Sequence, residues 1–155
     1  MIADASLVID AVADPGPRGV VARRALADHV ASEPLVAPGH FAIELMSGLR
    51  AAANRPGHPL TAEDVDTALS DAQSLEITIE ATPWADVHRA WELARGSLRY
   101  PDGIYVAAAE RHAVALITSD ARIGRSGAQV RTEIITVVPD DDWDTQRGTN
   151  EAPGL

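Results

Sequence analysis

Four acidic residues stand where their carboxylates could carry out chemistry together. Asp4 follows the apolar start of the chain, and Glu44 lies within a largely apolar segment. Asp102 and Asp120 flank another apolar segment. Carboxylates that share a pocket repel one another and raise one another's pKa values unless a cation compensates them, and hard oxygen ligands suit Mg²⁺ or Mn²⁺. An ion held there can activate water for cleavage of a phosphodiester.

Apolar periodicity predicts that strands and helices alternate along the chain. Short apolar or alternating runs predict strands at residues 1–4, 33–38, 75–80, 114–119 and 133–138. Helical spacing of apolar residues predicts helices at residues 18–32, 39–54, 61–72, 82–97 and 101–113, with Thr61 as a helix cap. Strands joined by helices form βα units around a parallel sheet. We therefore expect an α/β fold, with a central, mainly parallel sheet flanked by helices on both faces.

The predicted connections bring the acids to one edge of that sheet. Asp4 and Asp120 both end strands, and sites in open parallel sheets form beyond the carboxyl ends of the strands. Between Asp102 and Asp120 a helix leads ~18 Å away at 1.5 Å per residue, and a strand returns ~16 Å at 3.3 Å per residue. Asp102 should therefore lie level with Asp120. Glu44 is expected about one and a half turns into its helix, from where its longer side chain can reach back.

Each acid also has an ordinary structural explanation. Asp102 in "YPDG" and Asp120 after "ITS" could cap a turn or a helix, and Glu44 could be a solvated surface acid. Asp4 is harder to explain in this way, because a carboxylate inside an apolar segment needs a partner. As a set, the four residues favour one shared site.

The composition excludes several other kinds of site. The 155 residues suit one compact domain, and the absence of cysteine removes disulfides and thiolate metal sites and suits a reducing compartment. All thirteen basic residues are arginine, so the lysine that a receiver domain or a haloacid-dehalogenase-like phosphatase needs is missing. No signal peptide is recognisable, and no apolar run approaches the ~20 residues that cross a bilayer. We expect a cytoplasmic protein with no membrane association.

The formal net charge of −10 restricts how the chain could bind nucleic acid. An acidic surface repels phosphate backbones, so a purely electrostatic nucleic-acid binder is disfavoured. Arginines would have to make any phosphate contacts. Arg122 and Arg125, just after Asp120, are the best placed, although both could be ordinary surface residues. The charge also favours a basic protein partner.

The five histidines show no metal-ligand spacing. His40 lies one turn before Glu44 and could touch the site, but we expect a surface histidine at the start of its helix. Neither a P-loop nor a dinucleotide-binding glycine pattern is present.

Four short motifs together resemble one family of nucleases. They are "ADAS", "PGHFAIELMSGL", "PDGIYVAAAE" and "LITSDARI". In this order and at these separations they resemble the PIN-domain ribonucleases, and within them the VapC-type toxins of bacterial toxin–antitoxin pairs. The resemblance covers roughly residues 1–139 and implies a PIN-like α/β/α sandwich. We expect a nuclease domain over 1–139 and a flexible acidic tail over 140–155.

The resemblance also suggests what individual residues do. It gives the metal-binding and catalytic role to four acids: Asp4, Glu44, Asp102 and Asp120. Ser6 and Thr118 match hydroxyls that brace such a site by hydrogen bonds, and Tyr105 matches an aromatic residue that we expect to serve packing. Gly103 departs from the alanine usual in the family, which should slightly weaken the helix start. The first strand is short, unless the true start lies upstream of Met1.

The activity implied by the resemblance is cleavage of an RNA phosphodiester by water, with Mg²⁺ or Mn²⁺ as cofactor and a 5′-phosphate product. The resemblance also implies a homodimer, and a hetero-oligomer with a small VapB-like antitoxin that places a basic side chain near the acids. The alternative is a non-catalytic protein that keeps the fold and holds a basic peptide in its acidic groove. The presence of all four acids favours the nuclease.

Overall fold

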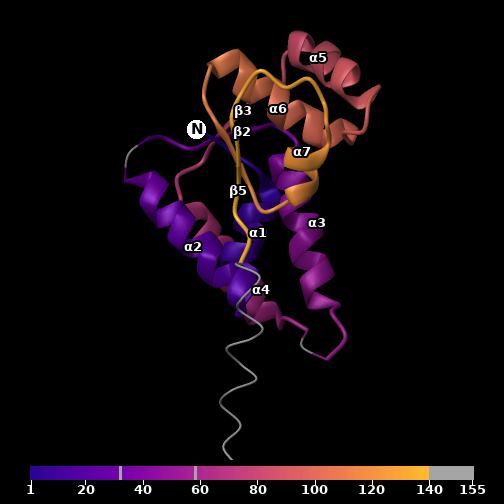
Figure 1. Ribbon diagram of the computed structural model, residues 1–155. Helices are drawn as coiled ribbons and strands as arrows, with labels where there is room; N and C mark the ends of the chain where they lie inside the picture. Colours follow the sequence, from indigo (N-terminus) through magenta and orange to yellow (C-terminus); the bar gives the residue numbers. More distant parts are fainter. Residues whose placement is uncertain (32, 58, 140–155) are drawn as a thin grey trace, which may run out of the picture.

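A five-stranded sheet organises the described part of the chain, which in this computed structural model comprises residues 1–31, 33–57 and 59–139 (Figure 1). The strands are β1 (Ile2–Ala3), β2 (Val36–Pro38), β3 (Thr78–Glu80), β4 (Leu116–Thr118) and β5 (Ile134–Thr136). Their order is β3-β2-β1-β4-β5, and every pairing is parallel. The expected parallel α/β architecture is thus confirmed. The acidic segment 140–155, expected to be a flexible tail, lies outside the described residues.

Helices flank the sheet on both faces (Figure 1). The described residues form α1 (Ala5–Ala13), α2 (Pro17–Val30), α3 (Phe41–Ala53), α4 (Ala62–Ser74), α5 (Trp84–Ala94), α6 (Tyr100–His112) and α7 (Ala121–Arg125). Successive strand residues point to opposite faces. Ile2 packs in a core cluster with residues of α3 and α6, whereas Ala3 packs in a second cluster with residues of α2. Both faces of the central strands β1 and β4 are therefore buried, which explains why these strands are mainly apolar, whereas the edge strand β3 is more exposed.

Two helices were not predicted, and each begins at a site acid. The apolar periodicity predicts no element over residues 5–13, where α1 lies, and none over α7. Asp4 and Asp120 are the N-caps of these helices, and their side chains accept hydrogen bonds from the backbone N–H groups of Ser6 and Arg122. Helix α1 is apolar and mostly buried, so it lacks the polar face that marks a surface helix.

The start of α4 was predicted correctly. Thr61 caps the helix, and its hydroxyl accepts a hydrogen bond from the Asp64 backbone N–H while the Asp64 carboxylate accepts from the Thr61 backbone N–H. This reciprocal pair is a capping box. Strand β3 is shorter than the predicted 75–80, because residue 75 ends α4 and Glu76 has a positive φ of 51°.

Gly103 has a packing role that the sequence did not reveal. Helices α5 and α6 cross closely at this residue, and a Cβ added to Gly103 would lie 3.0 Å from the Ala90 carbonyl oxygen and 3.1 Å from its Cα. Gly103 therefore lets the backbones of α5 and α6 approach each other closely. The lower helix propensity of glycine is the cost of this contact.

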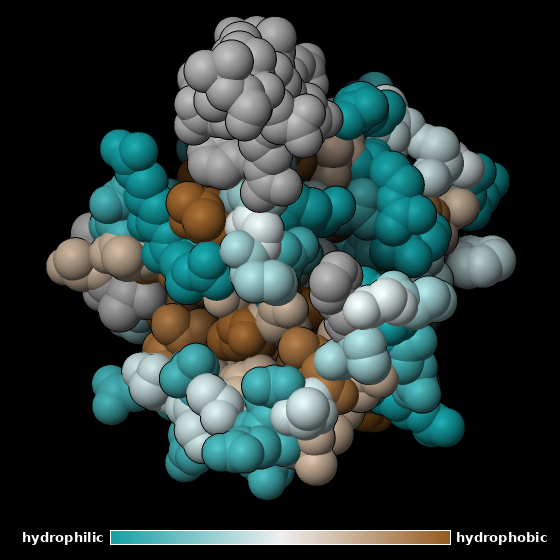
Figure 2. Space-filling view, turned by 90° about the horizontal axis from the view of Figure 1, so that it is seen from below, coloured by the Kyte–Doolittle hydropathy of each residue, from teal (hydrophilic) through white to brown (hydrophobic). Residues whose placement is uncertain are grey.

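An apolar groove of about 450 Å³ lies between α1, α2 and α4. Its apolar lining includes Ala11, Val12, Leu26 and Leu75. Seen from below, where α4 lies in Figure 1, apolar side chains gather at the centre of the surface between hydrophilic margins (Figure 2). None of the helices in the described residues is long and apolar enough to cross a lipid bilayer.

We expect Gly103→Ala to lower the free energy of unfolding, measured by urea denaturation, by about 1 kcal/mol, because over-packing against backbone atoms outweighs the gain in helix propensity. Gly96→Ala is the matched control in the α5–α6 connection, since its added Cβ would meet its nearest neighbour at 3.5 Å. A Gly103→Ala protein as stable as Gly96→Ala would show that the α5–α6 contact tolerates a methyl group.

Candidate functional site

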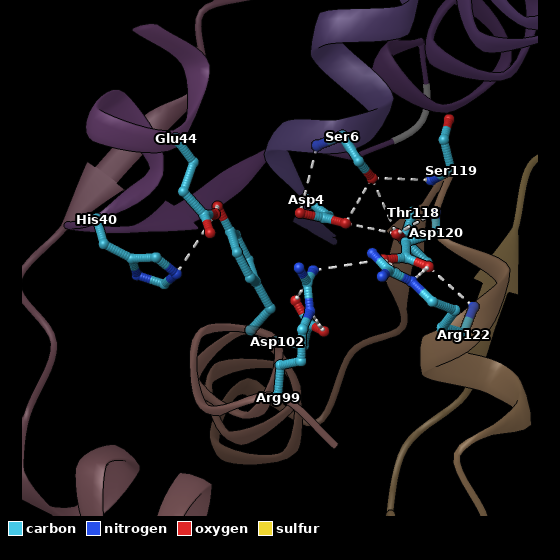
Figure 3. A network of polar contacts seen from close by, with 11 residues as sticks. Asp4, Ser6, His40, Glu44, Arg99, Asp102, Thr118, Ser119, Asp120 and Arg122 are labelled. Atoms are coloured by element: carbon cyan, nitrogen blue, oxygen red, sulfur yellow. Dashed lines mark hydrogen bonds and ion pairs between the residues drawn. The ribbon is translucent and has the colours of Figure 1, made fainter. Parts of the chain in front are cut away.

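The four acids lie at the carboxyl edge of the sheet, each at the start of a helix (Figure 3). Asp4 follows β1 and Asp120 follows β4. Asp102 lies in the first turn of α6, and Glu44 lies in the first turn of α3, closer to the helix start than predicted. The capping role considered for Asp120 is therefore real, and it coexists with a position at the shared edge.

Asp4 is buried and held by hydroxyl groups. Asp4 is only 6% exposed. Its Oδ2 accepts hydrogen bonds from Ser6 Oγ at 2.6 Å and from Thr118 Oγ1 at 2.5 Å. The Asp4 backbone N–H donates to the Ile117 carbonyl of β4 at 3.0 Å. The carboxylate is consequently fixed in position by residues of α1 and β4.

Burial raises the pKa of Asp4 above its ordinary value of 3.8. The hydrogen bonds from Ser6 and Thr118 oppose this shift, and the nearby negative charge of Glu44 adds to it. No arginine pairs with Asp4 among the described residues. Asp4 is thus the acid of the site whose charge is least compensated by the chain itself.

The Glu44 carboxylate contacts two ring side chains, those of Tyr105 and His40. The buried Tyr105 hydroxyl donates to Glu44 Oε2 at 2.8 Å, and His40 Nε2 lies 3.6 Å from the same oxygen. The rings of His40 and Tyr105 pack at a centroid distance of 4.6 Å. Tyr105 both packs and holds a carboxylate. His40 is half-buried against the site, so its expected role as a surface histidine is wrong.

Asp102 and Asp120 are joined by an arginine that the sequence analysis overlooked. Arg99 Nε and Nη2 each donate to the Asp102 carboxylate at 2.9 Å, and Arg99 Nη2 lies 3.4 Å from Asp120 Oδ2. Arg122 also pairs with Asp120, at 2.5 Å between Nη2 and Oδ2. The hydrogen bonds from Arg122 hold the pKa of Asp120 below its ordinary value. The signal that could have revealed Arg99 is its position three residues before Asp102 at a helix start.

The contacts divide the site into two connected halves. Asp4 and Glu44 form a half without an arginine partner among the described residues, in which Asp4 is buried and Glu44 is partly exposed beside His40. Asp102 and Asp120 form a half neutralised by Arg99 and Arg122. Thr118 Oγ1 joins the halves, because it donates to Asp4 and accepts from the Asp120 backbone N–H at 2.9 Å.

The chemistry of these donors suits a divalent cation, since all four side chains offer hard oxygen ligands and their negative charges meet at one edge. As they stand, however, no three His, Asp or Glu side chains within residues 1–31, 33–57 and 59–139 are grouped closely enough to hold a metal ion. Arg99 lies between Asp102 and Asp120 in this arrangement.

Comparison by sequence places known nucleases among the relatives of the chain. The family model of the PIN domain matches residues 1–128. Ribonuclease VapC3 from two strains of Mycobacterium tuberculosis is 32% identical over 126 residues, which covers 81% of this chain and 86% of the relative.

Solved structures share the fold at lower identity. The crystal structure of Mycobacterium tuberculosis VapC20, a toxin that cleaves the sarcin-ricin loop, matches with a TM-score of 0.58 and 17% identity over 82% of this chain and 95% of the other. A toxin–antitoxin complex from Klebsiella pneumoniae matches with a TM-score of 0.56 and 21% identity over 87% and 95%. At these identities the similarity supports the fold.

The opposite pKa shifts of Asp4 and Asp120 predict opposite effects of neutral substitutions on the metal-free protein. A raised pKa in the folded state makes stability fall as pH rises through and above 3.8, so Asp4→Asn should gain stability over the wild type as pH increases from 4 to 8. A lowered pKa contributes stability above 3.8 that is lost as pH falls, so Asp120→Asn should be less stable at pH 7 and converge with the wild type in acid.

Thermal or urea unfolding in EDTA across this pH range measures both differences. If Asp4→Asn is destabilised to the same extent at every pH, the burial of an uncompensated carboxylate at Asp4 is refuted.

Proposed function

Because the chain belongs to the PIN-domain family, we propose that it is a metal-dependent endoribonuclease toxin of the VapC type, which cleaves RNA phosphodiesters by attack of water. The observation that carries this proposal is the arrangement of Asp4, Glu44, Asp102 and Asp120 around one edge of the sheet. Thr118 and Arg99 connect Asp4, Asp120 and Asp102, and the charge of Glu44 is close enough to act on Asp4. A 5′-phosphate product is part of the proposal.

The residues that would hold the metal are Asp4, Glu44, Asp102 and Asp120. Bound there, Mg²⁺ or Mn²⁺ would activate a water molecule and stabilise the charge that develops on the phosphate. The absence of lysine supports a divalent cation as counter-charge for the set, together with the arginines.

The surrounding side chains of this chain orient the carboxylates. Ser6 and Thr118 donate to the same oxygen of Asp4, so the other oxygen, Oδ1, faces the site with only a 3.4 Å contact to the Ser6 backbone N–H. Tyr105 holds one oxygen of Glu44. Such fixed ligands reduce the reorganisation needed when a cation and a substrate bind.

Arg99 acts in this proposal as an internal counter-ion. Its side chain is 58% exposed, so it can leave Asp102 and Asp120 for solvent or for a substrate phosphate. A divalent cation that takes Asp102 and Asp120 would displace the Arg99 guanidinium from them. Arg122 and Arg125 are proposed to contact RNA phosphates beside the site.

The proposed partners are RNA, a cognate VapB-like antitoxin and a second copy of the chain in a homodimer, with a hetero-oligomer formed by toxin and antitoxin. The apolar groove between α1, α2 and α4 supports a protein partner, because exposed apolar surface of this kind marks interaction sites. The net charge of −10 supports a basic one.

Purified protein without antitoxin should cleave RNA in Mg²⁺ or Mn²⁺ and be inactive in EDTA. Asp102→Asn should lower the cleavage rate by on the order of 10²–10³, because it removes a charge that stabilises the reacting centre. Asp66→Asn on α4 is the control, since Asp66 is exposed and its side chain makes no ion pair within the described residues. A wild-type protein that cleaves no RNA in any of these ions would favour the non-catalytic, peptide-binding alternative.

Removal of the internal counter-ion should strengthen metal binding. In Arg99→Gln the cation no longer competes with a guanidinium for Asp102, although Arg122 still pairs with Asp120. The Mn²⁺ dissociation constant should fall about three- to tenfold, the worth of one partly exposed ion pair. Titration followed by the paramagnetic resonance of free Mn²⁺ measures this constant without RNA.

Arg95→Gln provides the matched control, because Arg95 is exposed in the same α5–α6 connection and forms no ion pair among the described residues. Metal affinity that is unchanged or weaker in Arg99→Gln would exclude competition between Arg99 and the cation.

A further inference from the structure

A second cavity of about 490 Å³ opens beside the acids, at the end of β4. Residues from α1, α2 and α7 line it, and we call it the Ser119 pocket. Its polar lining consists of Ser6, Arg18, Ser119, Asp120, Arg122 and Arg125. Ser6 and Asp120 belong to both the pocket and the acidic site, so the two are continuous.

Ser119, in the wall of this pocket, has a buried hydroxyl without a partner among the described residues. Ser119 is 3% exposed, and its Oγ forms no hydrogen bond within the described residues, although its backbone N–H donates to Ser6 Oγ at 3.2 Å. Figure 3 shows the Ser119 side chain directed away from Asp4 and Thr118. A buried hydroxyl without a partner costs free energy, and a ligand that accepts its hydrogen bond recovers it.

Two of the three arginines of the pocket are already paired, and the third is not. Arg18 Nη2 lies 2.9 Å from Asp10 Oδ2, and Arg122 pairs with Asp120. Arg125 forms no ion pair in the part of the chain that the structure describes. The pocket therefore holds one uncompensated guanidinium and one uncompensated hydroxyl donor, on an otherwise acidic protein.

We infer that the Ser119 pocket binds a phosphate group of the RNA substrate. This phosphodiester neighbours, in the same strand, the phosphodiester that is cleaved. The Ser119 hydroxyl and the Arg125 guanidinium donate to its oxygens, and Arg18 and Arg122 lie at the rim. Phosphate oxygens accept both kinds of bond, and a guanidinium matches their geometry. The carboxylates of Asp10 and Asp120 do not oppose this, because Arg18 and Arg122 neutralise them. This inference rests on the proposed function.

The test is equilibrium binding of a fluorescein-labelled, eight-nucleotide RNA of random sequence, followed by anisotropy in EDTA at several NaCl concentrations. Ser119→Ala should weaken binding about threefold to tenfold without changing the salt dependence, because it removes a neutral hydrogen bond. Arg125→Gln should weaken binding about tenfold and make the slope of log K against log [NaCl] shallower by about 0.7, the value for one lost contact to single-stranded nucleic acid.

Two further variants test whether the effect depends on the charge at position 125 and not on the loss of any surface arginine. Arg125→Lys keeps the charge and should keep the slope. Arg24→Gln removes an exposed arginine of α2 that forms no ion pair in the described residues, and it should bind RNA as the wild type does. Thermal melting confirms that each variant is folded.

Unchanged RNA affinity in both Ser119→Ala and Arg125→Gln would overturn the inference. Tighter binding in Ser119→Ala would also overturn it, because the Ser119 hydroxyl would then not contribute to RNA binding. Cleavage that is lost in Asp102→Asn while the pocket variants bind normally would leave the nuclease proposal standing. Weaker binding by the pocket variants of a protein that cleaves no RNA would support the pocket and refute the nuclease.

Discussion

The need to compensate four carboxylates at the carboxyl edge of a parallel sheet is the constraint on which this site depends. The fold brings Asp4, Glu44, Asp102 and Asp120 to one edge, and a chain without lysine has few ways to compensate them. The structure shows two different responses. Asp102 and Asp120 are paired with arginines, whereas burial raises the pKa of Asp4 and leaves it without a basic partner.

These two responses give the halves of the site different properties. The half containing Asp4 is rigid, because Ser6, Thr118 and the backbone of β4 fix its carboxylate. The half containing Asp102 depends on Arg99, whose side chain pairs with Asp102 and Asp120 yet is 58% exposed. In the proposed function, a divalent cation replaces the Arg99 guanidinium at Asp102 and Asp120, while Asp4 stays in place. The Ser119 pocket, beside the acids, would bind the RNA phosphate next to the phosphodiester that is cleaved.

The sequence predicted the sheet and the placement of the acids better than it predicted their immediate partners. The strand ends at Asp4 and Asp120 follow from apolar runs, and the helix–strand arithmetic placed Asp102 level with Asp120, where Arg99 now bridges them. Helix α1 was missed because it is mostly apolar and buried, and α7 because five residues are too few to show helical periodicity. Ser119 escaped notice, and His40 was expected at the surface, because their surroundings arise from contacts between elements that no local pattern records. Arg99 was overlooked although its three-residue spacing from Asp102 is a local signal.

The central claim is that the carboxylates of the four acids bind a divalent cation, and that the Arg99 guanidinium leaves Asp102 and Asp120 when they do. Anomalous diffraction from crystals of the protein soaked in Mn²⁺ tests it most directly. The account predicts manganese density bounded by the carboxylates of Asp4 and Asp102, with the Arg99 guanidinium moved away from Asp102 and Asp120. Crystals that at saturating Mn²⁺ show no density among the four acids, and keep Arg99 paired with both aspartates, would contradict it.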